Sequence, residues 1–156
     1  MPEPAWPSGT RQLSDAEFVA AMDGLTLSGD DFRHYDHLRL AWIFLRESNG
    51  VAGPDLHAAT DRMTQAIRRF ATHHGAVGKY HDTMTRAYMR FVAAHARMTP
   101  QLDDFAEFAV AHPELFEKAL PFVYYSESRL MGAAARAGWV EPDLRPLPTV
   151  SAWHSA

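Results

Sequence analysis

Apolar residues recur every three to four positions along most of this chain, the spacing that places them on one face of an α-helix. Capping residues, glycines and prolines interrupt the pattern, so the chain divides into segments of ordinary helix length. The expected helices span about residues 14–24, 30–50, 54–75, 79–98, 100–112, 114–121 and 126–139. We find no alternation typical of strands. The sequence predicts an all-α, single-domain bundle of about five to seven helices.

Proline-rich stretches mark both ends of the expected domain. Residues 1–12 carry three prolines and no periodic pattern, which predicts a flexible N-terminal arm. Three prolines also occur in the closing sequence VEPDLRPLPTVSAWHSA, which predicts an extended C-terminal tail packed on the surface. We therefore expect one helical domain over residues 13–148, followed by a tail over residues 149–156.

Composition narrows the classes of partner. The 156 residues are 47% apolar and 22% charged, as in an ordinary globular protein, and the net charge of -4 gives no basic surface for nucleic acid. No apolar run approaches the ~20 residues of a membrane span, and the first residues lack the pattern of a signal peptide. We therefore expect a cytoplasmic protein without a membrane or nucleic-acid partner. Because cysteine is absent, any metal must be held by nitrogen or oxygen ligands.

The placement of the histidines is the strongest chemical signal. In FRHYDHLRLAWIFLR, His34 and His37 lie three residues apart on the face that also carries Leu38 and Ala41. The segment KYHDTMT places His81 on the apolar face of a later helix. Antiparallel helices joined by short connections would bring these rings to one end of the bundle. The sequence therefore predicts a metal site formed by His34, His37 and His81.

A fourth imidazole would change the character of this site. Three neutral imidazoles leave an open position on a zinc ion, whereas His74 as a fourth ligand would close the shell. The alternative is that His73 and His74 only end a helix, where the helix dipole favours them. The remaining histidines, His57, His95, His112 and His154, fit surface or capping positions.

The expected metal is zinc or copper, because both bind imidazole well. Iron in a two-histidine, one-carboxylate site is disfavoured, since neither Asp36 nor Asp82 has the right helical phase. Tyr80, Thr85 and Tyr125 supply hydroxyl groups that would shape a catalytic pocket beside the metal.

Three functions remain open. The first is a small metalloenzyme in which the ion activates water, dioxygen or a carbonyl group of a small-molecule substrate, by hydrolysis, lyase chemistry or oxidation. The second is a metal-free accessory or small-ligand-binding protein whose histidines are hydrogen-bonded in the core. The third is a metal-holding or sensing protein without turnover. Nothing in the sequence decides the oligomeric state.

The same motifs carry a resemblance. FRHYDHLRLAW, KYHDTMTRAY and YYSESRLMGAAARAGWVEPDLRPLP resemble three blocks of a small, uncharacterised bacterial family of helical proteins, with FxHxxHLRLAW and KYHxTxT as its recurring motifs. The resemblance covers most of residues 32–148. It implies that His34, His37, His81 and Thr85 belong to a shared motif, but it brings no activity. One departure is Tyr124-Tyr125-Ser126, where the family pattern has histidine, tyrosine and serine.

Overall fold

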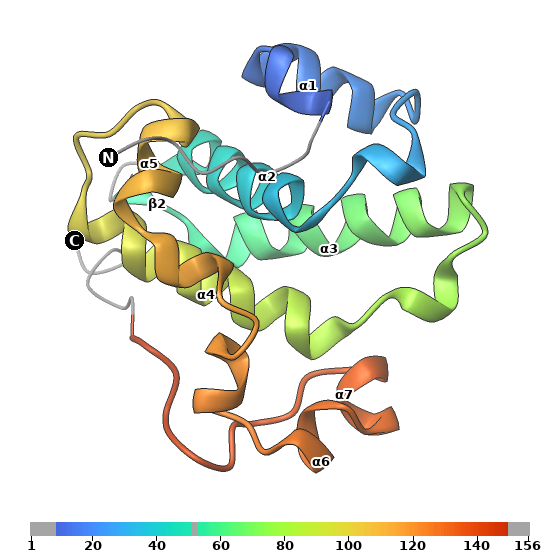
Figure 1. Ribbon diagram of the computed structural model, residues 1–156, viewed down its shortest axis with the longest axis vertical. Helices are drawn as coiled ribbons and strands as arrows, with labels where there is room; N and C mark the ends of the chain where they lie inside the picture. Colours follow the sequence, from blue (N-terminus) through green and yellow to red (C-terminus); the bar gives the residue numbers. More distant parts are fainter. Residues whose placement is uncertain (1–8, 51–52, 150–156) are drawn as a thin grey trace.

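Three long helices, α2 (His34–Glu47), α3 (Leu56–His73) and α4 (Asp82–Met98), pack against one another and carry the fold (Figure 1). The computed structural model describes residues 9–50 and 53–149. Over this part the chain is all-α, and its seven α-helices confirm the predicted class and number. The other α-helices are α1 (Asp15–Asp23), α5 (Phe105–Ala111), α6 (Glu127–Leu130) and α7 (Ala133–Ala137).

Short 3-10 helices and one minimal strand pair connect the helices. The five 3-10 helices are η1 (Gly9–Gln12), η2 (Gly29–Asp31), η3 (Val77–Lys79), η4 (Pro113–Phe116) and η5 (Leu120–Val123). Between α2 and α3, β1 (Asn49–Gly50) pairs antiparallel with β2 (Gly53–Pro54), with Asn49 opposite Pro54. In the part of the chain that the structure describes, no helix is long and apolar enough to cross a membrane.

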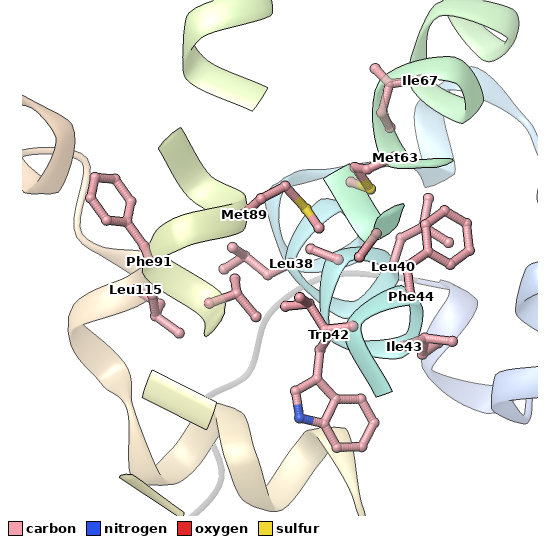
Figure 2. Packing of buried hydrophobic residues seen from close by; sticks show 14 of the residues in the cluster. Leu38, Leu40, Trp42, Ile43, Phe44, Met63, Ile67, Met89, Phe91 and Leu115 are labelled. Carbon is pink, nitrogen blue, oxygen red and sulfur yellow. The ribbon is translucent and has the colours of Figure 1, made fainter. Parts of the chain in front are cut away.

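Helix α2 is the centre of the core. Residues 38–45 are all buried, because this helix is covered on every side along these two turns. Leu38, Met63 and Met89, one from each of α2, α3 and α4, meet where the three helices converge (Figure 2). Helix α1 lies on one side of the three helices, and α6 and α7 lie on the other side, with α7 against α4 (Figure 1).

Several helix boundaries follow the sequence signals. Ser14 caps α1, and a capping box joins its hydroxyl to the Glu17 N–H at 3.1 Å while the Glu17 carboxylate accepts the Ser14 N–H at 2.8 Å. Helix α3 ends at His73, and Gly75 takes a left-handed φ of 66° that only glycine adopts without cost.

Other boundaries differ from the prediction. Helix α2 begins at His34 rather than near residue 30, because residues 29–31 form the short helix η2, which Ser28 caps. Helix α5 begins at Phe105 rather than near residue 100, and Asp104 caps it by accepting the Glu107 N–H at 3.1 Å. Helix α4 begins at Asp82 rather than near Lys79, and this shift changes the role of the residue before it, His81.

The expected N-terminal arm is anchored over its last residues. Thr10 is buried and its hydroxyl donates to the carboxylate of Asp36. The buried guanidinium of Arg39 donates to the carbonyl oxygens of Thr10 at 2.9 Å and Leu13 at 2.7 Å, and it also pairs with Asp15. Because a buried charge needs such partners, residues 9–12 fold as a helical turn instead of extending. Residues 1–8 lie outside the described part.

The proline-rich segment lies along the bundle, as predicted. The Leu144 N–H donates to the Tyr124 carbonyl oxygen at 2.9 Å, and Asp143 accepts the N–H of Ser126, the cap of α6, at 2.7 Å. These bonds hold residues 143–144 against the segment that leads into α6. The remaining residues of the expected tail, 150–156, lie outside the described residues.

Candidate ligand pocket

A pocket of about 330 Å³ opens between the first half of α2, the second half of α3 and the first half of α4. His34, His37 and His81 all line it, together with Tyr80 and Thr85. The sequence argument that placed these residues at one end of the bundle thus identifies residues that share one pocket. The apolar part of the lining includes Leu38, Ala41, Met63, Ile67, Met84 and Met89.

His37 is a polar group of the pocket that lacks a hydrogen-bond partner among the described residues. Within the described part of the chain, neither of its ring nitrogens forms a hydrogen bond, and no fully buried side-chain nitrogen there lacks a partner. The ring nitrogens of His37 are therefore open to solvent, and the residue lines both this pocket and an adjoining one. Burial, reinforced by the neighbouring His34, lowers the pKa of His37 to about 4. The ring is neutral at pH 7 and offers one donor and one acceptor.

His34, the first residue of α2, is oriented by a backbone carbonyl. Its Nε2 lies 3.1 Å from the carbonyl oxygen of Leu115, so Nε2 carries the hydrogen and Nδ1 keeps its lone pair. The ring meets Tyr88 edge-on at 5.2 Å. Desolvation lowers the pKa of His34, and the hydrogen bond to Leu115 opposes this change. His34 is therefore also a neutral imidazole with one free nitrogen.

His81 has both ring nitrogens engaged. It is the N-cap of α4, where its Nδ1 accepts the Met84 N–H at 3.0 Å, and its Nε2 donates to the Leu130 carbonyl oxygen at 2.7 Å. The sequence prediction placed His81 on a helical face as a free ligand. The structure places it one residue before the helix, because the imidazole itself provides the cap. As folded here, His81 has no lone pair to give to a metal ion.

Tyr80 is fixed at the pocket by a buried charge cluster. Its hydroxyl donates to Asp82 at 2.7 Å, and Asp82 also accepts from Arg86 at 2.8 Å and Arg68 at 3.4 Å. Burial raises the pKa of Asp82, but the hydrogen bonds from Tyr80 and Arg86 and the two positive charges hold it below its ordinary value. Burial raises the pKa of Tyr80, as does its bond to Asp82. The Tyr80 hydroxyl is therefore neutral, and its proton is already donated to Asp82.

The other predicted site residues have structural partners. The Thr85 hydroxyl donates to the His81 carbonyl oxygen at 2.8 Å while its side chain lines the pocket. Tyr125 is fully buried away from this pocket and donates to the Val140 carbonyl oxygen at 2.8 Å. His74 lines an adjoining pocket, and its Nε2 is 3.1 Å from the Leu27 carbonyl oxygen. Neither Tyr125 nor His74 joins the three predicted metal ligands.

The charge of the pocket is one-sided. Arg33 and Lys79 are the charged residues that line it, and no carboxylate does so among the described residues. Asp36 and Asp82 are buried, but their partners hold them outside the lining. Arg33 precedes His37 by one helical turn, and Lys79 lines both of the pockets that share His37. In a chain of net charge -4, this is a local concentration of positive charge.

A second histidine cluster lies at the other end of α4. His95 and His112, with Glu114, bring one ligand atom each within 4.8 Å of one another. Both histidines were expected at surface or capping positions. His112 does end α5, but its side chain is buried. The available signal was the HPE sequence that ends α5, where Pro113 turns the chain so that His112 and Glu114 fall beside α4.

Comparison with known protein families, curated proteins and solved structures finds no match for this chain. The function has to be inferred from the pocket itself.

Proposed function

We propose that this chain is a small-ligand-binding protein, and that its pocket takes, without a metal ion, a compact apolar molecule carrying a carboxylate. One observation carries the proposal: a neutral imidazole, His37, faces an apolar pocket without a protein partner. The ring nitrogens of His37 are reached by solvent in the pocket, so a ligand that bonds to this ring replaces water and gains the net free energy of one hydrogen bond, roughly 1.5–3 kcal/mol when the partner is charged. The pocket volume falls in the range of small-molecule sites.

The charges specify the ligand further. A carboxylate accepts from the His37 N–H and is attracted by Arg33 and Lys79, while no carboxylate of the described lining repels it. The apolar body of the ligand lies against the methionine and leucine side chains beyond His37. Methionines adapt their shape to a ligand at low cost.

Binding is favoured over acid–base catalysis because of the pKa of His37. A general base works best when its pKa is near the working pH, and an imidazole with a pKa of about 4 holds a proton poorly at pH 7. Tyr80 and Thr85 already donate their hydroxyl protons to Asp82 and to the backbone. The predicted catalytic roles of these two residues therefore have less support than a role in shaping the pocket.

The test uses two probes of equal shape, 2-naphthoate and 2-naphthamide, titrated by calorimetry in the presence of a chelator. We expect saturable binding of the carboxylate and at least tenfold weaker binding of the amide. Lys79→Ala and Arg33→Ala should each weaken naphthoate binding roughly three- to tenfold at low salt and leave amide binding unchanged. Arg97→Ala, an exposed cation at the far end of α4, is the matched control.

Two results would overturn this proposal. The first is equal affinity for the amide and the carboxylate, since the cations then play no part. The second is the absence of saturable binding of either probe.

A histidine-ligated metalloenzyme is the second candidate, and the orientation of His34 favours it. A ligating histidine usually donates its other ring N–H to a carbonyl or carboxylate, as His34 Nε2 does to Leu115. His37 would add a second nitrogen to a zinc or copper ion. His81 would join them only after giving up a bond to Met84 or Leu130. Near one equivalent of zinc or copper, lost in His37→Ala but retained in His57→Ala, would select this candidate.

A further inference from the structure

The cluster at the C-terminal end of α4 has the donor set of a metal site. His95 comes from α4, His112 ends α5, and Glu114 belongs to η4, so three consecutive elements each supply one group. The His95 Nε2 is 2.9 Å from a Glu114 carboxylate oxygen, and the His112 Nδ1 is 3.6 Å from the same oxygen. In a tetrahedral shell with bonds of about 2.1 Å, ligand atoms lie about 3.4 Å apart. The two separations from the Glu114 oxygen lie on either side of this value, and the three ligand atoms all lie within 4.8 Å of one another.

Each ring can direct an unprotonated nitrogen, with its lone pair, toward Glu114. These nitrogens are Nε2 of His95 and Nδ1 of His112. The His95 Nδ1 lies 2.6 Å from the Phe91 carbonyl oxygen, and because a carbonyl only accepts, Nδ1 carries the hydrogen. In the neutral ring this leaves a lone pair on Nε2, which faces Glu114. The His112 Nε2 lies 2.8 Å from the Thr99 hydroxyl, which accepts from it when Nδ1 is the lone pair. Such outer hydrogen bonds are typical of ligating histidines.

The His95 Nε2, the His112 Nδ1 and the Glu114 carboxylate need a positive charge between them. Two imidazole lone pairs and a carboxylate directed at one point repel one another unless a cation or an added proton lies there. His112 is buried and His95 is largely so, while about half of the Glu114 side chain is exposed. An ion held there would be covered by protein on the imidazole side and open to solvent on the carboxylate side.

We propose that His95, His112 and Glu114 form a binding site for a divalent transition-metal ion such as zinc. Two imidazoles and one carboxylate are an established zinc donor set, and the solvent-facing side leaves a fourth position for water. Copper binds tighter than zinc in a given nitrogen site, so both ions compete for it. The site is separate from the ligand pocket, since none of its three residues lines that pocket.

The position of the site gives binding a structural consequence. The ion would join the end of α4 to the segment that leads from α5 into η4, a connection otherwise made by the Thr99–His112 bond and apolar packing. Binding to the folded state alone raises the midpoint of thermal unfolding as the ion concentration rises.

The test is a calorimetric titration of zinc into untagged full-length protein that has been stripped with chelator and dialysed. We expect one equivalent bound, with Kd raised at least tenfold in Glu114→Gln and in His95→Gln. Glu114→Gln keeps the side-chain shape at an exposed position, so it stays informative if His95→Gln folds poorly. Glu117→Gln, an exposed carboxylate of the following segment, is the matched control, and His37→Ala tests the pocket separately; both should bind as the wild type does.

Cobalt gives an independent reading of the geometry. Co²⁺ titrated into the wild-type protein should produce the visible absorption of a low-coordinate nitrogen and oxygen site, and Glu114→Gln should remove it. The proposal is overturned if the wild-type protein binds no zinc at 100-fold excess of ion over protein. Equal zinc affinity in wild type, Glu114→Gln and His95→Gln would also overturn it, leaving a protonated His95 paired with Glu114 as the explanation of the cluster.

Discussion

The Nε2 atom of His81 lies 2.7 Å from the carbonyl oxygen of Leu130, 49 residues later in the chain. The other ring nitrogen accepts the Met84 N–H inside the first turn of α4. One imidazole thus both starts α4 and joins it to the end of α6. This relationship explains why a residue that the sequence marks as a metal ligand is, in the folded chain, part of the framework of the pocket.

Replacing His81 should therefore lower stability. His81→Ala removes a helix cap and leaves the Leu130 carbonyl without its donor, so we expect a loss of about 1–3 kcal/mol in the free energy of unfolding. His81→Asn provides a good N-cap but does not reach Leu130, and its loss should be intermediate. Urea denaturation at pH 7.5 measures both. A His81→Ala variant as stable as the wild type would contradict this role.

The limits of the sequence reasoning are visible at the same residue. The apolar periodicity predicted the three helices α2, α3 and α4. Because short connections make neighbouring helices antiparallel, the sequence also predicted that His34, His37 and His81 lie at one end of the bundle. It placed the start of α4 near Lys79, whereas the helix starts at Asp82. Each residue turns a helix by about 100°, so an error of this size decides whether a side chain faces a pocket or caps the helix.

The second cluster was out of reach for a different reason. His95 and His112 meet through the packing of α4 against the chain after α5, a contact that no local pattern encodes. The rings pack edge-on at 5.1 Å, and His112 also lies against Phe108 at 4.8 Å. Only tertiary structure turns two histidines from separate helices, each typical of a helix end, into a pair that faces one carboxylate.

The neutral state of His37 should make stability depend on pH. Its pKa is about 4 in the folded protein against an ordinary value of 6.5. As the pH falls through 6.5, His37 becomes protonated in the unfolded chain. In the folded protein it stays neutral until about pH 4. The contribution of neutral His37 to the free energy of unfolding is therefore fully present above pH 6.5 and is lost between pH 6.5 and 4. The difference between the two pKa values corresponds to about 3 kcal/mol.

This dependence can be isolated by comparing variants. His37→Gln lacks the titrating ring, so its free energy of unfolding should fall less than that of the wild type between pH 7 and 4.5. His57→Gln, which alters an exposed histidine, should follow the wild type. Urea denaturation at four pH values, with chelator present, gives the difference. Identical slopes for His37→Gln and the wild type would show that His37 is not held neutral by burial.

Tyr125 should be structural. Its hydroxyl donates to Val140, its ring meets Trp139 edge-on, and burial raises its pKa to about 12. Tyr125→Phe should cost about 1 kcal/mol of stability, the usual value of one hydrogen bond, and leave naphthoate affinity unchanged. Denaturation and calorimetry on the same preparation test both points. A large loss of naphthoate affinity with unchanged stability would instead indicate that Tyr125 belongs to the binding site.

The most direct test of the central claim follows the His37 ring itself. Imidazole carbon and proton resonances, assigned with His37→Gln and His57→Gln, are recorded by NMR at pH 7.5 while 2-naphthoate is added to chelator-treated protein. We expect the His37 signals to shift saturably, with the dissociation constant found by calorimetry, while the His57 signals stay fixed. Binding of naphthoate with the His37 signals unmoved would contradict the claim that this neutral imidazole receives the ligand.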